Sequence, residues 1–213
     1  MQKNRAKAAA ASPAEVVRCP WGGIDDPLYA HYHDTEWGVP LADDRALLEK
    51  LILEGMQAGL SWLTILKKRE NFRRAFHNFD AERIARFTGR DVERLLQDTG
   101  IIRHRGKIEA AISNARAYLA IRERTSLAAL LWGIAGDDAS PAEPLHTMKD
   151  APTQTPASRR MSKALKAAGF RFVGPTTVHA FMQSVGMRND HLVTCHRHAP
   201  CAALQAAFVP PAH

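Results

Sequence analysis

Apolar residues recur at helical spacing along most of this 213-residue chain. The clearest example is the segment 43–62, whose apolar side chains fall on one broad face: Leu47, Leu48, Leu51, Ile52 and Met56. Spacings of three and four residues bring side chains together on one side of an α-helix, whereas a half-buried strand alternates polar and apolar residues. No run in the chain reads as such a strand. The sequence therefore predicts an all-α fold, with a long amphipathic helix over residues 43–62.

The same spacing predicts further helices, over residues 61–76, 80–87, 90–97, 106–122 and 126–134. Residues 136–157 contain four prolines, which favours a loop. The two ends of the chain have the composition of poorly ordered tails. Residues 1–17 are basic and rich in alanine, and residues 199–213 are rich in alanine and contain Pro210-Pro211.

The charge balance favours a polyanionic partner. The chain has 29 Lys and Arg residues against 22 Asp and Glu residues, a formal net charge of +7. A basic surface is typical of proteins that bind nucleic acid. No apolar run approaches the roughly 20 residues that span a membrane, and the first residues lack a signal-peptide pattern, so we expect a cytoplasmic protein. Three cysteines argue against a disulfide framework but leave metal binding open.

A helix, a tight hairpin and a second helix are predicted around residues 169–177. Ser158 can cap the first helix, and Gly169 stands where a helix needs a left-handed stop. Gly174-Pro175 then starts the second helix, because proline is tolerated at the first helical position.

This hairpin has the features of an anion site. Glycine allows backbone N–H groups to approach another molecule closely, and the start of a helix adds free N–H groups and a positive dipole end. Lys163, Lys166 and Arg171 add charge nearby. The hairpin therefore fits a DNA phosphate, although an ordinary corner between two helices has the same pattern.

Cysteine and histidine pairs occur near both ends of the chain. Cys19 and His33 lie fourteen residues apart near the beginning, and His191 and Cys195 lie four apart near the end. Two cysteines and two histidines form a closed structural zinc set. A second set is local: His191, Cys195, His198 and Cys201. If the first set binds the metal, the ion joins the two ends of the chain and stabilises the fold.

Five aromatic residues cluster in the first third of the chain together with one acid: Trp21, Tyr29, Tyr32, Trp37 and Trp62. Glu54 lies at the edge of the apolar face of the helix over residues 43–62. It could be a boundary carboxylate paired with Lys50, beside aromatic residues that only pack in the core. It could also lie at the floor of an aromatic pocket that stacks a planar base and reads its edge.

Residues 99–107 form another basic stretch, which joins two helices and contains Arg103, Arg105 and Lys107. Two readings stay open for it: a second phosphate clamp, or a solvated connector.

Taken together, these stretches resemble the DNA-3-methyladenine glycosylase I family, the constitutive bacterial type. The motifs that carry the resemblance are Arg18-Cys19-Pro20-Trp21, Asp26-Pro27-Leu28-Tyr29, Tyr32-His33-Asp34-Thr35-Glu36-Trp37-Gly38-Val39-Pro40, Leu53-Glu54-Gly55-Met56-Gln57-Ala58-Gly59-Leu60-Ser61-Trp62, Lys67-Lys68-Arg69-Glu70-Asn71, Gly100-Ile101-Ile102-Arg103-His104-Arg105-Gly106-Lys107-Ile108, Phe172-Val173-Gly174-Pro175-Thr176-Thr177 and Asn189-Asp190-His191-Leu192-Val193-Thr194-Cys195. Three positions depart from the family pattern as we expect it: an extra residue at Gly22-Gly23, Met56, and His196.

The resemblance implies the helix-hairpin-helix glycosylase fold. We expect one glycosylase domain over residues 18–198, with two helical lobes, a base pocket in the cleft between them, and the helix-hairpin-helix near residues 159–186. The resemblance implies one structural zinc ion per chain, bound by Cys19, His33, His191 and Cys195, as a clasp that joins the chain ends.

The resemblance also implies roles for individual residues. Glu54 would read the damaged base and act in catalysis, with Asp190 as a secondary catalytic candidate. Four aromatic residues would line the base pocket: Trp62, Tyr32, Tyr29 and Trp21. We expect DNA contacts from Gly169, Arg171, Gly174, Thr176, Lys163, Lys166 and Arg105.

The implied reaction is the hydrolytic excision of 3-methyladenine from alkylated double-stranded DNA by a monofunctional, monomeric enzyme of the bacterial cytoplasm. Free 3-methyladenine and an abasic site would be the products. Two other functions stay open: a glycosylase of broader base range, and a DNA-binding helix-hairpin-helix module without catalysis. A metallohydrolase is disfavoured, because four protein ligands leave no metal position for water.

Overall fold

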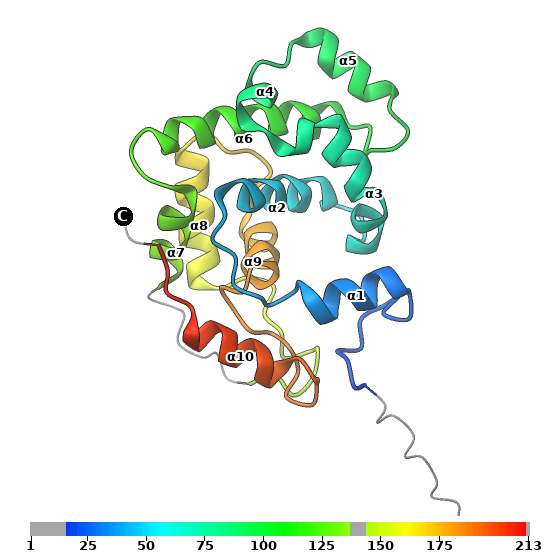
Figure 1. Cartoon of the computed structure of the whole chain (residues 1–213), viewed down its shortest axis with the longest axis vertical. Coiled ribbons are helices and arrows are strands. Elements are labelled where there is room, and N and C mark those ends of the chain that lie inside the picture. Colours follow the sequence, from blue (N-terminus) through cyan, green and yellow to red (C-terminus); the bar gives the residue numbers. More distant parts are fainter. Residues whose placement is uncertain (1–15, 137–143, 212–213) are drawn as a thin grey trace, which may run out of the picture.

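The computed structural model describes residues 16–136 and 144–211, which form helices and connecting loops without a strand in these two ranges. The first elements are α1 (Pro27–Thr35), α2 (Asp44–Gln57), α3 (Trp62–Ala75), the short 3-10 helix η1 (His77–Phe79), α4 (Ala81–Ala85) and α5 (Gly89–Gln97). They are followed by α6 (Arg105–Arg122), α7 (Leu127–Ala135), α8 (Pro156–Ala167), α9 (Pro175–Ser184) and α10 (His198–Ala207). The predicted all-α class is confirmed (Figure 1).

Helix α2 is the centre of the fold. It packs against α3, α6, α7 and α9, and Figure 1 shows it between the upper helices and α9. Its apolar side chains from Leu47 to Met56 are almost fully buried. Asp44 in its first turn also accepts hydrogen bonds from the backbone N–H groups of Leu127 and Ala128, which fixes the start of α7.

The chain turns between α2 and α3, so the expected continuous helix over residues 43–62 is wrong in its last part. Gly59 has a φ of +80°, in the left-handed region that glycine adopts readily. Ser61 then caps α3 by accepting a hydrogen bond from the backbone N–H of Thr64. The apolar spacing continues across the turn, but the glycine and the cap residue divide the helix. As a result, Glu54 at the end of α2 and Trp62 at the start of α3 face the same space.

The predicted hairpin lies between α8 and α9. Gly169 has a φ of +97° after the end of α8, and Gly174 precedes Pro175 at the start of α9. The predicted cap at Ser158 is wrong, because Thr155 begins the helix. Thr155 and Ser158 exchange hydrogen bonds in a capping box.

Two helices near the ends of the chain were not expected. Helix α1 carries Tyr32 and His33, and its cap is Asp26. Helix α10 replaces much of the poorly ordered tail expected over residues 199–213, a correction that alanine's high helix propensity explains. It is held by packing: the ring of Phe208 lies 4.4 Å from that of Trp132 between centroids. Of the predicted N-terminal tail, residues 1–15 lie outside the described residues.

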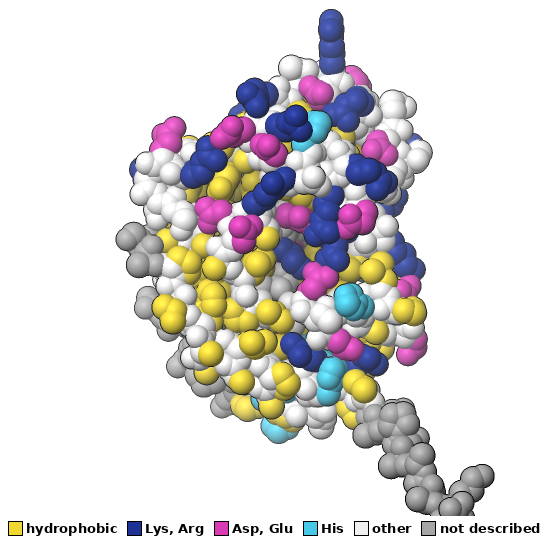
Figure 2. Space-filling view, in the orientation of Figure 1, with side chains coloured by type: hydrophobic (Ala, Val, Ile, Leu, Met, Phe, Trp, Pro, Cys, Tyr) yellow, Lys and Arg dark blue, Asp and Glu magenta, His cyan; other side chains and the backbone are white. Residues whose placement is uncertain are grey.

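Two apolar clusters stabilise the described part of the chain. The larger one unites α2 with most of the other helices. The smaller one surrounds Cys19 and Cys195, and it includes Tyr32, Trp37 and Leu192. Figure 2 shows acidic and basic side chains interleaved over the upper helices, and apolar side chains gathered over the lower part near α10. Among the described residues, no helix has the length and apolar character that crossing a bilayer requires.

Candidate functional site

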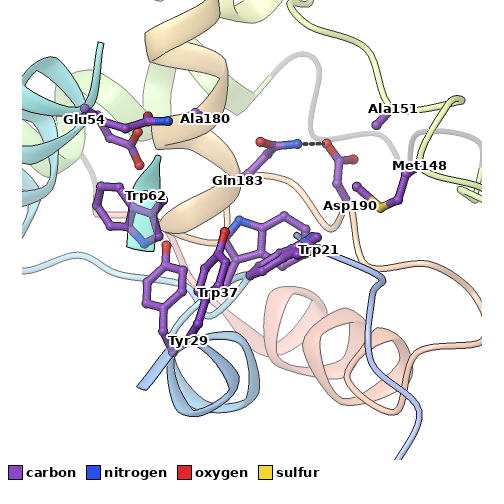
Figure 3. Close-up of a pocket in the computed structure, with 12 residues that line it drawn as sticks. Trp21, Tyr29, Trp37, Glu54, Trp62, Met148, Ala151, Ala180, Gln183 and Asp190 are labelled. Atoms are coloured by element: carbon purple, nitrogen blue, oxygen red, sulfur yellow. Dashed lines mark hydrogen bonds between the residues drawn. The ribbon is translucent and has the colours of Figure 1, made fainter. Parts of the chain in front are cut away.

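A cavity of about 200 Å³ opens between α1, α2, α3 and α9. Figure 3 shows Glu54 at one end, Asp190 near the other, and aromatic rings along one wall. Its lining consists of Trp21, Tyr29, Tyr32, Trp37, Glu54, Gln57, Trp62, Met148, Ala151, Ala180, Gln183 and Asp190. The structure therefore brings together Glu54 and all four aromatic residues that were predicted to line a base pocket.

The aromatic residues form a continuous wall. The ring centroids of Tyr32 and Trp62 lie 5.5 Å apart, those of Tyr29 and Tyr32 6.4 Å apart, and those of Trp21 and Tyr29 5.1 Å apart. Trp37 meets Trp21 edge to face at 4.6 Å. Such a wall presents ring faces to a planar, electron-poor ligand.

Glu54 is the buried acid of this pocket. Its side chain belongs to the last turn of α2 and is only 3% exposed. Burial raises the pKa of the carboxyl group to about 8, although the positive charge of Lys50 acts in the opposite direction. Glu54 is thus fully inside the molecule, and the alternative of a boundary carboxylate is wrong.

Two polar atoms in the pocket wall are buried without a hydrogen-bond partner among the described residues: Oε2 of Glu54 and Nε1 of Trp62. Buried polar atoms in folded proteins are nearly always hydrogen-bonded, so each exception asks for an explanation. A ligand with a hydrogen-bond donor at its edge would satisfy the Glu54 oxygen.

Lys50 lies behind the pocket rather than in a surface pair with Glu54. Its ammonium nitrogen is 3.4 Å from a carboxylate oxygen of Glu36, which Arg69 also binds at 2.6 and 2.9 Å. The same nitrogen lies 4.6 Å from the ring centroid of Tyr32 and 5.6 Å from that of Trp62. The pocket therefore has the amino group of Lys50 close to Glu54, and burial lowers the pKa of that amino group.

Asp190 lines the opposite side of the pocket and is already bound by neighbouring side chains. Gln183 donates a hydrogen bond to one of its oxygens at 2.6 Å, and Arg188 donates to the other at 2.7 Å. Nε2 of His179 lies 3.6 Å from it. This carboxylate is 2% exposed, and its partners hold it in the wall (Figure 3).

Cys19, His33, His191 and Cys195 come together in a buried cluster that can bind a metal ion. One ligand atom from each residue lies within 4.8 Å of all the others. The sulfur-to-nitrogen distances are 3.7 Å for Cys19 and His191, 3.6 Å for Cys195 and His33, and 3.5 Å for Cys195 and His191. A tetrahedral site with zinc–sulfur distances of about 2.3 Å and zinc–nitrogen distances of about 2.0 Å places these atoms roughly 3.5 Å apart.

The surroundings of this cluster orient its ligands. Nδ1 of His33 lies 2.8 Å from a carboxylate oxygen of Asp34, and Nε2 of His191 lies 3.1 Å from the carbonyl oxygen of Trp37. Each histidine thus has its second nitrogen engaged, as metal-binding histidines generally do. In the described part of the chain, the local set with His198 and Cys201 does not form a group of this kind.

The candidate DNA-binding residues of the hairpin lie at the surface. Lys163, Lys166, Gly169, Arg171 and Thr176 are exposed, and Gly174 is partly exposed. Arg105 is also exposed, but its guanidinium group lies 2.6 Å from a carboxylate oxygen of Glu93. The hairpin therefore presents both its backbone and unhindered charge to solvent.

Several lining residues have no signal in the sequence that could have placed them in the pocket. Gln183 lies on α9, Gln57 follows Glu54 on α2, and Met148 and Ala151 belong to the loop before α8. Trp37 differs from these residues, because the sequence analysis had already grouped it with the other aromatic residues of the first third of the chain.

Comparisons with known proteins point to one family. A family model described as methyladenine glycosylase matches residues 21–198. The chain is 51% identical over 181 residues to DNA-3-methyladenine glycosylase 1 of Escherichia coli (strain K12), covering 84% of this chain and 96% of that protein. A crystal structure of a 3-methyladenine DNA glycosylase I has 54% identity and a TM-score of 0.82, over 85% of this chain and 100% of that one. A variant of such an enzyme in complex with 3-methyladenine has 39% identity and a TM-score of 0.78, over 83% and 95%.

Proposed function

This chain belongs to the methyladenine glycosylase family, and we propose that the aromatic pocket beside Glu54 is where it binds and excises its base. Its activity is the excision of 3-methyladenine from DNA, a step in the base excision repair of alkylation damage. The observation that carries the assignment of the pocket is the buried Oε2 of Glu54, which has no hydrogen-bond partner among the described residues, in an aromatic cavity.

Recognition depends on the edge and the face of the base. The exocyclic amine of adenine is a hydrogen-bond donor, whereas guanine has an acceptor oxygen at the corresponding position. An ionised Glu54 accepts from the amine and disfavours guanine. Tyr32 and Trp62 stack on the ring, which methylation makes electron-poor and cationic. The positive charge of the bound base lowers the pKa of the Glu54 carboxyl group again, so the acid becomes ionised when the base enters.

The chemical step needs little help from an acid. Methylation at N3 gives the base a positive charge, so that it leaves C1′ of the deoxyribose as a neutral molecule while water adds to this carbon and releases one proton to solvent. The main work of the protein is therefore to hold the extruded nucleotide in the pocket, and extrusion costs less for a damaged base. Asp190 remains a secondary catalytic candidate, because it lines the pocket although its oxygens are occupied by Gln183 and Arg188.

DNA binding is assigned to the hairpin between α8 and α9. The N–H groups at the start of α9 would bind a phosphate of double-stranded DNA, with charge from Lys163, Lys166 and Arg171. We expect a monomer, which acts in the bacterial cytoplasm because its substrate is the chromosome.

Zinc is the proposed ion of the cysteine and histidine cluster. Two thiolates and two imidazoles at tetrahedral separations suit zinc. The ion would have a structural role, joining Cys19 and His33 to His191 and Cys195, and the closed ligand set leaves no place for a reacting water.

The experiment that tests this function is the release of bases from methylated duplex DNA, identified by chromatography. The wild-type protein should release 3-methyladenine, and Glu54→Gln should release it roughly tenfold to a hundredfold more slowly, because the amide cannot replace a carboxylate facing a cationic base. Release of 7-methylguanine as well would favour the broader glycosylase. Salt-dependent DNA binding without any base release would favour the DNA-binding module.

A further inference from the structure

Lys107 lies in the first turn of α6, where a buried ammonium group needs an explanation. Its side chain is 7% exposed, and burial lowers the pKa of its ammonium group. The start of a helix carries positive partial charge, so α6 itself disfavours a cation at this position. The partner that stabilises Lys107 must therefore come from another element.

That partner is the end of α2. Nζ of Lys107 donates hydrogen bonds to the carbonyl oxygens of Met56 at 2.8 Å and Ala58 at 2.6 Å. The last carbonyl groups of a helix lack partners within the helix and carry negative partial charge. In α2, which the structure describes completely, the last turn contains no basic residue. Lys107 thus supplies the cation for this helix end from across the interface.

The two carbonyl groups belong to the turn that connects the main groups of the pocket. Glu54 lies in the last turn of α2, two residues before Met56, and Trp62 begins α3 after the turn. Movement of this turn would change the position of the carboxylate relative to the indole ring. Both side chains line the cavity, and each has a polar atom without a hydrogen-bond partner among the described residues. Their relative placement therefore determines how a base fits between them.

The hairpin supports the same helix end. A Cβ atom on Gly55 would lie 3.1 Å from Cβ of Phe172, which shows how closely the hairpin packs on α2. Lys107, Gly55 and Phe172 also line one small internal cavity. Asn114, further along α6, fixes the hairpin by exchanging hydrogen bonds of 2.7 and 3.1 Å with the backbone of Arg171. Helix α6 therefore holds the end of α2 and the hairpin in one fixed arrangement.

These contacts also decide between the two readings of residues 99–107 for Lys107. A phosphate clamp needs an ammonium group that is accessible and free of strong partners. The ammonium group of Lys107 is instead buried against two backbone carbonyl groups.

We propose that Lys107 is a positioning residue for base excision: its ammonium group holds the turn between α2 and α3, and thereby sets the placement of Glu54 and Trp62 around the base. This inference rests on the proposed function of the pocket. Misplacement of a catalytic group by about 1 Å can slow a reaction roughly a hundredfold, so the contact is important although Lys107 does not line the aromatic pocket.

The test compares three variants with the wild-type protein. Lys107→Met removes the charge and keeps most of the length, Lys107→Arg keeps the charge and the donors, and Lys68→Met is the matched control. Lys68 also donates to a backbone carbonyl oxygen, that of Thr99 at 2.8 Å, but this contact lies outside the pocket. If Lys107→Met does not fold, Lys107→Gln replaces it.

Three quantities are measured well below the thermal midpoint: the single-turnover rate of 3-methyladenine release, the affinity for free 3-methyladenine from tryptophan fluorescence, and the affinity for undamaged duplex DNA over a range of salt. Lys107→Met should slow release roughly tenfold to a hundredfold and weaken base binding, and Lys107→Arg should restore most of both. Affinity for undamaged duplex should stay within about twofold, with an unchanged salt slope, because no phosphate contact is lost. Lys68→Met should behave like the wild type.

Each other outcome overturns the inference. A folded Lys107→Met protein with wild-type release and base affinity would show that the contact does not position the pocket. A weaker, less salt-dependent affinity for undamaged duplex would make Lys107 a phosphate contact. A change in the thermal midpoint without a change in rate or base affinity would leave only a structural role. If the wild-type protein itself released no 3-methyladenine, the proposed function would fail first, and the inference with it.

Discussion

The pKa of Glu54 is set by the surroundings of its side chain in the folded protein. Its neighbours in the sequence place it at the edge of an apolar face, where a carboxylate is ordinarily solvated. The structure buries it among aromatic rings, with Lys50 near enough for its charge to act on the carboxyl group. A protein that only had to fold would be more stable with an uncharged side chain at this position. The acid is therefore retained at a cost in stability, as is common for residues that bind a ligand.

This cost predicts a pH-dependent gain in stability for Glu54→Gln. The pKa of Glu54 is raised from 4.5 to about 8 in the folded protein, so between these values the folded state binds more protons than the unfolded state. The stability of the wild type therefore falls as the pH rises through this window, and the glutamine variant escapes that loss. Chemical denaturation should show the variant gaining roughly 1–4 kcal/mol at pH 8 relative to pH 5.

The control for this measurement is Glu49→Gln, on the same helix. Glu49 forms an ion pair with Arg73 at 2.8 Å near the surface, and its loss should destabilise the protein slightly. Both variants keep the cysteine and histidine cluster, so its own pH dependence cancels in the comparison. An equal effect of Glu54→Gln at pH 5 and pH 8 would contradict the buried, protonated acid.

At the scale of elements, the hairpin between α8 and α9 combines backbone strain with an exposed surface. Gly169 has a φ of +97°, and Phe172 has a φ of +55° although it is not a glycine. Ser162 holds the carbonyl group of Val173 at 2.6 Å from within α8. A hairpin held in this way would present its N–H groups at the start of α9 to the proposed phosphate without a rearrangement on binding.

Two glycine substitutions separate stability from DNA binding in this hairpin. Gly169→Ala should cost about 1–2 kcal/mol, because an L-residue is strained at a positive φ, even though its Cβ would only touch Cβ of Ala117 at 3.7 Å. Gly174 has an ordinary φ of −63° and open space around its Cβ position. Gly174→Ala should keep the thermal midpoint but weaken the binding of duplex DNA, because the new methyl group lies at the proposed phosphate site.

The comparison is made by thermal denaturation and by DNA binding at several salt concentrations. A Gly174→Ala protein with wild-type DNA affinity would show that no DNA phosphate binds at the start of α9. A Gly169→Ala protein with unchanged stability would show that the turn tolerates a side chain in another conformation.

At the scale of the whole molecule, the cysteine and histidine cluster joins the two ends of the described chain. Cys19 lies in the segment before α1 and His33 on α1, whereas His191 and Cys195 lie between α9 and α10. The backbone N–H of His196 also donates to the carbonyl oxygen of Val17 at 2.9 Å. The ring of Trp21 connects this region to the pocket, since it lies 4.8 Å from that of His33 and 5.1 Å from that of Tyr29.

Removal of the metal should therefore affect both stability and base binding. A clasp over most of the chain restricts the unfolded state, and its loss should cost roughly 3–5 kcal/mol. Elemental analysis should find one zinc ion per chain in the wild type and much less in Cys19→Ala, with a lower thermal midpoint and weaker binding of free 3-methyladenine. Cys201→Ser is the control, because Cys201 is buried nearby but does not belong to the cluster. Full metal content in Cys19→Ala would contradict the ligand set.

The sequence predicted the helices of the core and the hairpin because their spacing, caps and glycines are local signals. It could not show that Glu54 is buried, since burial depends on α1 and α9 covering the end of α2. The apolar spacing continues through the turn at Gly59, so the sequence did not reveal that the predicted helix ends before this residue. Helix α10 is stabilised by the contact of Phe208 with Trp132, which composition alone does not reveal. Lys107 could not be separated from its basic neighbours until the carbonyl groups of α2 were in place.

The proposed function requires that the base enters the aromatic pocket and contacts Glu54. A crystal structure of the protein soaked with free 3-methyladenine tests this contact. We expect the base against Tyr32 and Trp62, with its exocyclic amine within hydrogen-bond distance of the Glu54 carboxylate. A base bound outside this cavity, or one inside it that leaves Glu54 without a contact, would rule out Glu54 as the residue that recognises the base.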